Sequence, residues 1–336
     1  MDTKILESTV EKLMQKPKGL LAIDESTESC NKRFESVGVE PTESARREYR
    51  ELLVSAPEIE NYVSGYIMYD ETIRQTTLDG KRFPDILKEK GIEPGIKVDQ
   101  GLESFNGSPI EQVTKGLDGL RDRLIDYRTN FGASFTKWRV ALHITADGLP
   151  SEACMRENAV RLAQYAKMVQ EEQMVPIIEP EVLLDGGHSI ETCFEVTSKN
   201  LAIVFEEMKR AEVYLPGLIL KTSMVLPGKN APITASVDDV AKRTVQCLRD
   251  QVPHEIGGVV FLSGGQSSEL AAAHLNKMHE LYLDLPWGLT FSYSRAIQND
   301  TLNHWAKNRA DVAGSQALLI KWARANSDAR MGNLKA

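Results

Sequence analysis

The chain has 336 residues, and its formal net charge at pH 7 is −8. An acidic chain of this kind lacks the basic surface that nucleic acids require. No apolar run is long enough to span a membrane, and the first 16 residues resemble neither a signal peptide nor a transit peptide.

Cysteine usage indicates the compartment. The four cysteines are Cys30, Cys154, Cys193 and Cys247, and no two of them form a CxxC pair. Scattered cysteines are typical of free thiols in a reducing environment. We therefore expect a cytoplasmic protein that binds neither nucleic acid nor a membrane.

Eight short, mostly apolar segments along the chain have the pattern of buried strands. In chain order they are residues 19–24, 65–70, 95–99, 134–142, 175–181, 217–221, 258–262 and 288–295. Segments with apolar residues at helical spacing precede the first of them and recur between and after the others. The pattern is therefore a repeated strand and helix.

Two details of the helices can be predicted from local signals. Ser108, Pro109 and Glu111 suit the cap, first and third positions of a helix, so a helix is predicted to begin at Ser108. The last helix is predicted to be a single long one, and residues 326–336 are expected to form a flexible tail.

Alternating strands and helices favour an α/β fold with parallel strands, because parallel strands need helical crossovers. Eight such units close into a (β/α)8 TIM barrel, here one domain over residues 1–325. The alternative is an open, doubly wound sheet, which normally has a Gly-rich first turn. No such turn follows the first predicted strand.

In a barrel of this type the active site lies at the carboxyl ends of the strands. Those ends carry an unusual concentration of charged and hydroxyl side chains, which are Asp24, Asp70, Lys97, Lys137, Glu179, Glu181, Lys221, Ser263, Ser292 and Arg295.

Lys221 is the most informative of these residues. It follows the apolar run 218–220, and a buried ammonium group is costly unless it is paired or chemically used. A free lysine has a pKa near 10.4, so only about one in a few thousand is neutral at pH 7. Burial and neighbouring cations are expected to lower the pKa of Lys221 to roughly 7–8, which would make it a nucleophile.

Two carboxylates and two cations share the neighbouring strands. Glu179 and Glu181 are two residues apart, as are Lys137 and Arg139, so each pair is expected to share a face. One interpretation is that the two carboxylates form structural salt bridges with Lys137 and Arg139. For Glu181 this interpretation is as well supported as a catalytic role. For Glu179 we favour an acid/base role, with a pKa raised by the second carboxylate.

Two groups of residues suggest phosphate sites. Ser263-Gly264-Gly265 precedes a helix and offers backbone N–H groups, and Arg295 follows the eighth strand. Lys97, Lys32 and Arg33 form a second group of cations. Two phosphate sites around an amine predict a substrate with a central carbonyl and a phosphate at each end.

No metal or cofactor is expected. The six histidines form no metal signature. A Mg²⁺ site on Asp24, Glu179 and Glu181 would be opposed by the lysines predicted at the same mouth.

Together these segments closely resemble class I fructose-bisphosphate aldolase. The resemblance runs in order from about residue 4 to 325. Its motifs are Leu21 to Thr27, Gly95 to Asp99, Lys137-Trp138-Arg139, Glu179-Pro180-Glu181, Leu220-Lys221 with Met224-Val225, Phe261 to Gly265, and Phe291 to Arg295.

The resemblance implies a metal-independent cleavage of fructose 1,6-bisphosphate to dihydroxyacetone phosphate and glyceraldehyde 3-phosphate, in glycolysis and gluconeogenesis. It implies that Lys221 forms an imine with the substrate, that Glu179 is the main acid/base, and that Asp24, Lys137 and Glu181 assist. The implied substrate-binding residues are Ser26, Ser29, Arg33, Lys97, Ser263, Gly264, Gly265, Ser292 and Arg295. It further implies a homotetramer and an association with cytoskeletal partners.

Two departures from the family pattern bear on substrate preference. The family's vertebrate members end in a tyrosine-containing tail, whereas the last tyrosine here is Tyr293. Ser294 stands where the family often has glycine, and a positive φ there would cost about 1 kcal/mol or more.

Two rival functions remain. One is a related imine-forming enzyme that acts on another phosphosugar, such as a transaldolase-like or monophosphate-specific enzyme. The other is a binding or scaffold role without turnover, against which the intact set Asp24, Lys137, Glu179 and Lys221 argues.

Overall fold

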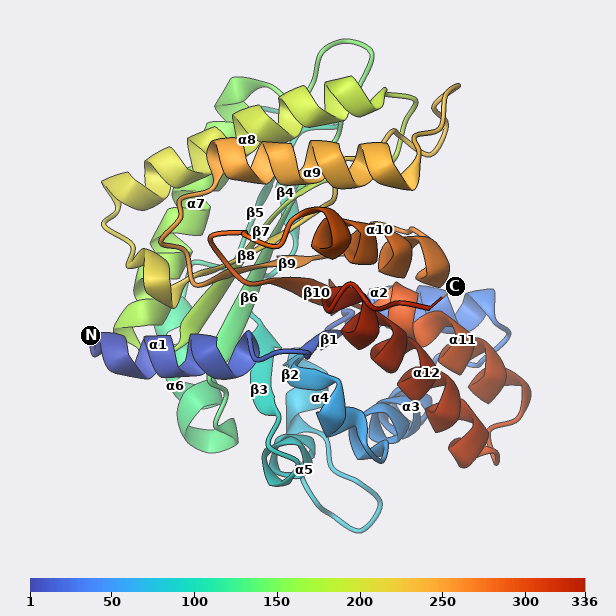
Figure 1. Cartoon of the computed structure of the whole chain (residues 1–336). Coiled ribbons are helices and arrows are strands. Elements are labelled where there is room, and N and C mark those ends of the chain that lie inside the picture. The colour runs from blue at the N-terminus through green and yellow to red at the C-terminus, as the bar shows by residue number, and fades with distance from the viewer. Residues whose placement is uncertain (336) are drawn as a thin grey trace.

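Eight parallel strands form a closed barrel in the computed structural model, which describes residues 1–335 (Figure 1). Around the barrel the strand order is β1-β10-β9-β8-β7-β6-β3-β2. The strands are β1 (Gly19–Ile23), β2 (Val63–Met68), β3 (Glu93–Lys97), β6 (Phe135–Leu142), β7 (Val175–Val182), β8 (Ile219–Thr222), β9 (Gly258–Phe261) and β10 (Leu289–Tyr293). The predicted (β/α)8 barrel is confirmed, and all eight predicted strands are present.

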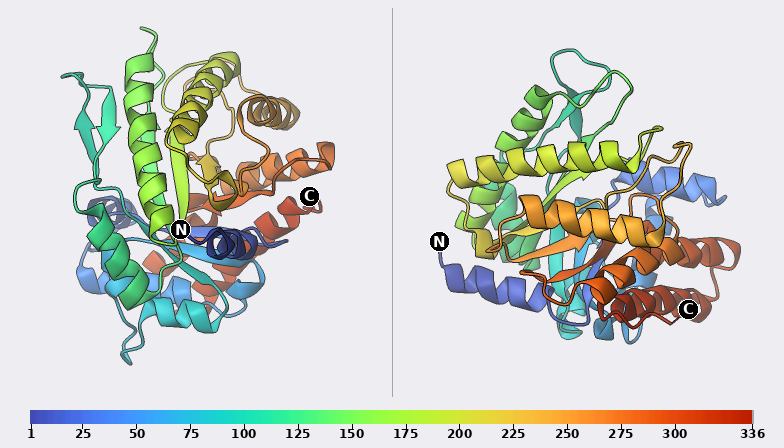
Figure 2. Two further views of the ribbon diagram at one scale, coloured as in Figure 1. Left: turned by 90° about the vertical axis from the view of Figure 1, so that its left-hand side faces the viewer. Right: turned by 45° about the horizontal axis from the view of Figure 1, so that its top comes forward.

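Helices surround the barrel on its outer face (Figures 1 and 2). They are α2 (Thr27–Ser36), α3 (Glu43–Ser55), α4 (Asp70–Arg74), α5 (Phe83–Glu89), α6 (Leu120–Phe131), α7 (Glu152–Glu171), α8 (Ile190–Arg210), α9 (Val237–Gln251), α10 (Ser268–Leu281), α11 (Arg295–Lys307) and α12 (Val312–Arg330). Two short 3₁₀ helices, η1 (Ile59–Asn61) and η2 (Leu215–Gly217), lead into β2 and β8. No helix among residues 1–335 combines the length and apolar character needed to cross a membrane.

The first helix, α1 (Thr3–Leu13), lies against the end of the barrel where the strands begin (Figure 2). Its buried face, Leu6, Val10 and Leu13, belongs to the same apolar cluster as side chains inside the barrel. Gly95 makes room for this interior, since a Cβ there would lie 2.2 Å from the Phe135 ring. The amino-terminal end of the barrel is therefore filled, and the opposite end is left for the site.

Two predictions about helices are wrong. Residues after β3 form a hairpin of β4 (Leu102–Ser104) and β5 (Gln112–Thr114), and Ser108 caps its turn by accepting hydrogen bonds from the backbone N–H groups of residues 110 and 111. An Asx/ST-type turn and a helix N-cap use the same side-chain contact, which explains the error. The predicted single last helix is divided into α11 and α12 at residues 308–311.

The flexible tail predicted from residue 326 is also corrected. Helix α12 continues to Arg330, and both Asn326 and Arg330 are buried. The Arg330 guanidinium donates hydrogen bonds to the carbonyl groups of Met14, Gln15 and Lys18. The end of the chain thus holds the connection between α1 and β1. Residue 336 lies outside the described residues.

We expect Arg330→Ala to lower the free energy of unfolding by about 2–3 kcal/mol, because the buried carbonyl groups lose a charged donor. Denaturant titration of the variant measures this loss. Arg324→Ala is the matched control, because its side chain is 68% exposed on the same helix. An unchanged midpoint for Arg330→Ala would contradict a structural role for the chain end.

Candidate active site

A cavity of about 1170 Å³ opens at the carboxyl ends of the barrel strands. The candidate site residues named from the sequence line it, with two exceptions, Lys32 and Gly265. Those that line it are Asp24, Ser26, Ser29, Arg33, Asp70, Lys97, Lys137, Glu179, Glu181, Lys221, Ser263, Gly264, Ser292 and Arg295.

Strand register places the charged residues side by side. Lys97 on β3 pairs with Lys137 on β6, and Arg139 on β6 pairs with Glu179 on β7. Lys221 lies on the next strand, β8. Because neighbouring parallel strands are in register, residues near their carboxyl ends lie close together. Four strands, β3, β6, β7 and β8, therefore contribute charged side chains to the same part of the cavity.

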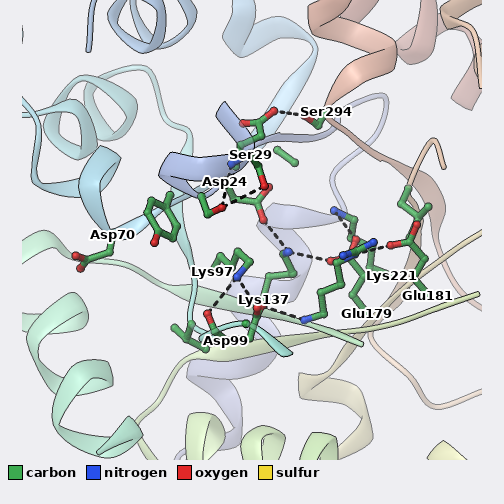
Figure 3. Close-up of a pocket in the computed structure, with 18 of the residues that line it drawn as sticks. Asp24, Ser29, Asp70, Lys97, Asp99, Lys137, Glu179, Glu181, Lys221 and Ser294 are labelled. Atoms are coloured by element: carbon green, nitrogen blue, oxygen red, sulfur yellow. Dashed lines mark hydrogen bonds and ion pairs between the residues drawn. The ribbon is translucent and has the colours of Figure 1, made fainter. Parts of the chain in front are cut away.

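A continuous chain of ion pairs crosses the floor of the cavity (Figure 3). The Lys221 ammonium is 3.1 Å from Glu179 Oε1, and the Lys137 ammonium is 2.9 Å from Glu179 Oε2. Lys137 also reaches Asp24 at 2.7 Å, where Asp24 follows β1 on the other side of the mouth. Lys221, Lys137 and Glu179 are each at most 4% exposed. Two cations therefore share one buried carboxylate.

The electrostatics of this chain favour ionised groups. Burial works against the charge on Asp24, but the Lys137 and Lys221 ammonium groups outweigh it and lower the pKa of Asp24 to about 2. Burial likewise opposes the charge on Lys137, yet Asp24 and Glu179 raise the pKa of its ammonium group. Lys137 is thus a permanent cation.

The predicted direction for Glu179 is wrong. Burial opposes its ionisation, but Lys137 and Lys221 prevail and lower its pKa. The expectation of a raised pKa assumed that Glu181 would be the nearest charge. Glu181 instead pairs with Arg139, at 2.5 Å, whereas Glu179 lies between two lysines. The two carboxylates therefore have different cations as partners.

We expect acid to destabilise the fold through Asp24. Its pKa is about 2 in the folded protein and near 3.8 when exposed, so its contribution of about 2 kcal/mol is fully present above pH 4 and is lost as pH falls through 2. The free energy of unfolding should fall less steeply between pH 4 and pH 2 in Asp24→Asn than in the parent chain. The exposed variant Asp250→Asn is the control, and parallel curves for Asp24→Asn and the parent would contradict the assignment.

The predicted anion nest is present after β9. Gly264 and Gly265 have φ angles of +60° and +92°, which only glycine adopts without strain. Ser292 Oγ on β10 is buried, lines the cavity and has no hydrogen-bond partner within residues 1–335. Arg295 lines the same side of the cavity and is solvent-exposed. These groups are available to a phosphate.

The second cationic group divides differently from the prediction. Lys97 pairs with Asp99, and Asp99 also accepts a hydrogen bond from the Arg139 N–H. Arg33 instead pairs with Glu25 and lies 3.5 Å from Asn299 of α11, near Arg295. The exposed Lys32 pairs with Glu28. Lys97 and Arg33 therefore serve different sides of the mouth.

Ser26 and Ser29 lie at the amino end of α2, where Ser26 is the N-cap and accepts a hydrogen bond from the Ser29 N–H. The segment is polar, so its sequence has no apolar periodicity from which a helix can be predicted. As a helix start it offers backbone N–H groups to the cavity.

Some cavity-lining residues were not identified as site residues from the sequence. They are Glu25, Tyr69, Asp99, Arg123, Arg139 and Ser294. Arg139 carried a signal, since it shares a strand face with Lys137, but it was interpreted as a salt-bridge partner. Arg123 carried none: it lies on α6, and its contacts are the carbonyl groups of Val98 and Gly116.

Comparisons with known proteins agree on one family. The family model described as fructose-bisphosphate aldolase class-I matches residues 5–336. A "Probable fructose-bisphosphate aldolase class 1" of Xanthomonas campestris is 48% identical over the full length of both chains. "Fructose-bisphosphate aldolase 4, cytosolic" of Arabidopsis thaliana is 46% identical over 95% of this chain and 80% of its own.

A solved structure agrees with these sequence matches. It is the fructose-bisphosphate aldolase from Plasmodium falciparum, in complex with TRAP and a small-molecule inhibitor. Its TM-score is 0.96 at 42% identity, covering 99% of this chain and 96% of that chain.

Proposed function

Because the chain belongs to the class I fructose-bisphosphate aldolase family, we propose that it cleaves fructose 1,6-bisphosphate reversibly through an imine on Lys221. The products are dihydroxyacetone phosphate and glyceraldehyde 3-phosphate. The observation that carries the proposal is the buried chain Lys221, Glu179, Lys137 and Asp24 at the floor of the cavity.

The nucleophile must first lose a proton. The Glu179 carboxylate, 3.1 Å from the Lys221 ammonium, is placed to accept it. The neutral amine adds to the C2 carbonyl of the substrate. Glu179 then returns its proton to the C2 hydroxyl, and loss of water gives a protonated imine and restores the Glu179 carboxylate. This cationic imine withdraws electrons from C3, so that the C3–C4 bond can break without a metal.

Bond cleavage requires a base and a cation. A base removes the proton of the C4 hydroxyl, the C3–C4 electrons move into an enamine on Lys221, and the aldehyde product leaves. Glu179 is ionised in the free protein and is the proposed base. Lys137 stays charged and stabilises the negative charge that develops on oxygen. Protonation of the enamine at C3 and hydrolysis of the imine then release the second product.

The phosphate groups position the substrate. Lys221 lies on β8. The neighbouring strand is β9, which leads to the Ser263 and Gly264 nest, and β10, which carries Ser292, lies on the other side of β9. The phosphate on C1 is one carbon from the reacting C2, so we assign it to this side. The phosphate on C6 is then assigned to Lys97 on β3, which is opposite β9 in the barrel, together with Ser26 and Ser29 at the start of α2.

The test is a cleavage assay in which the release of glyceraldehyde 3-phosphate is coupled to NADH consumption, in the presence of EDTA. We expect cleavage of fructose 1,6-bisphosphate that EDTA leaves unchanged. Fructose 1-phosphate is assayed in parallel through its own aldehyde product. A faster reaction with fructose 1-phosphate would favour a monophosphate enzyme, and no reaction with either substrate would overturn the proposal.

We further propose a homotetramer located in the cytoplasm. The support is the family resemblance together with relatives named as cytosolic, although another relative is named as chloroplastic. Light scattering after size-exclusion chromatography measures the assembly, and a mass near 37 kDa, that of one chain, would contradict the tetramer.

A further inference from the structure

Ser294 lines the cavity at the point where β10 leads into α11. It precedes α11 with a φ angle of −106°, so the strain considered for a positive φ does not arise. The backbone at this position therefore accepts a serine side chain without strain, and the side chain has a hydrogen-bond partner. The Ser294 hydroxyl donates a 2.7 Å hydrogen bond to Glu25 Oε1 (Figure 3).

The direction of this hydrogen bond is fixed by a second one. Gln298 Nε2, one turn along α11, donates to Ser294 Oγ at 3.1 Å and to the Ala22 carbonyl at 2.6 Å. Because Ser294 Oγ accepts from Gln298, its own proton is directed to the Glu25 carboxylate. Gln298 is buried, which keeps the hydroxyl in this orientation.

The Glu25 carboxylate also pairs with the Arg33 guanidinium, which contacts the same oxygen, Oε1. The two side chains are only 15% and 17% exposed, and both line the active-site cavity. Arg50 holds the Glu25 backbone by donating to its carbonyl at 2.9 Å. The carboxylate is thus held at the cavity wall by Ser294, Arg33 and its anchored backbone.

This arrangement places an internal anion where a substrate phosphate is expected. A carboxylate paired with a guanidinium uses the same donors that a phosphate would use. Arg33 lies near Arg295, on the side assigned above to the C1 phosphate. The phosphate must therefore compete with Glu25 for Arg33.

We propose that Ser294 is a positioning residue that acts through Glu25, keeping Arg33 paired and thereby weakening the binding of the phosphate next to the reacting carbonyl. The proposal rests on the proposed function for the identity of that phosphate. Removal of the hydroxyl destabilises the paired arrangement and increases the fraction of chains in which Arg33 is free. The apparent affinity for phosphate rises by the same factor, about threefold to tenfold for one hydrogen bond.

The experiment compares Ser294→Ala with Ser294→Thr, which keeps the hydroxyl and tolerates the same φ angle. Titration calorimetry with inorganic phosphate measures the anion site without turnover. We expect the phosphate Kd to fall about threefold to tenfold in Ser294→Ala and to stay at the parent value in Ser294→Thr. In the cleavage assay, KM for fructose 1-phosphate should fall by the same factor while kcat is unchanged.

Arg33→Ala provides the mechanistic control. If Ser294 acts through Glu25 and Arg33, adding Ser294→Ala to Arg33→Ala changes neither Kd nor KM further. An unchanged or raised Kd in Ser294→Ala overturns the inference, as does an equal effect in the Arg33→Ala background. If the parent chain binds phosphate but cleaves no substrate, the proposed function fails while the calorimetric comparison still decides the role of Ser294.

Discussion

Lys221→Met is expected to abolish aldol cleavage, with kcat lower by about four orders of magnitude or more, as when a covalent nucleophile is removed from other enzymes. Methionine fills nearly the same volume in a site that is only 3% exposed, so the fold should survive. The coupled cleavage assay measures the loss, and circular dichroism verifies folding.

The matched control is Lys242→Met. Lys242 is an exposed lysine of α9, and within residues 1–335 its one ion pair is with Asp238 on the same helix. It should retain the parent rate. Residual activity within tenfold of the parent in Lys221→Met would show that another group carries the reaction. Lys137 is then the alternative, since it shares the same carboxylate.

Glu179→Gln should lower kcat by about 10²- to 10⁴-fold, the usual contribution of one general acid/base. The amide keeps the shape of the side chain but cannot accept the proton of the Lys221 ammonium. Substrate binding should change much less, because the phosphate sites lie elsewhere in the cavity. Steady-state kinetics with fructose 1,6-bisphosphate separate kcat from KM.

Glu181→Gln is the comparison variant for Glu179→Gln. Glu181 is equally buried and lies two residues away on β7, but its partner is Arg139 rather than a lysine amine. Its effect on kcat should be clearly smaller. If kcat falls by the same factor in the two variants, contact with Lys221 does not identify the principal base, and the proposed role of Glu179 is wrong.

The barrel could be predicted from the sequence because its strands are short, mostly apolar segments that end in charged or hydroxyl residues. The run 217–221 is one example. Its consecutive apolar residues are typical of a parallel strand that is covered on both faces. Local signals failed where one contact serves two structures. Ser108 caps a turn as readily as a helix, and the polar segment that contains Ser26 gave no periodicity from which α2 could be recognised.

Most of the predicted site residues line the cavity, but their pairing could not be predicted. Sequence distance placed Glu179 beside Glu181, whereas the barrel places it between Lys137 and Lys221. This difference reverses the predicted shift in its pKa. Arg33 was grouped with Lys97 by charge alone, although its partner Glu25 keeps it near α11. Such pairings depend on side-chain reach across the mouth of the barrel, which spacing along the chain does not encode.

The central claim, an imine on Lys221, is tested most directly by borohydride reduction with dihydroxyacetone phosphate in the presence of EDTA, followed by peptide mass mapping. Reduction converts the imine to a stable secondary amine on the lysine that formed it. We predict a single adduct on Lys221 and a parallel loss of cleavage activity. An adduct on Lys137 or Lys97 would contradict the assignment of the nucleophile, and the absence of any adduct together with loss of activity in EDTA would contradict the imine mechanism.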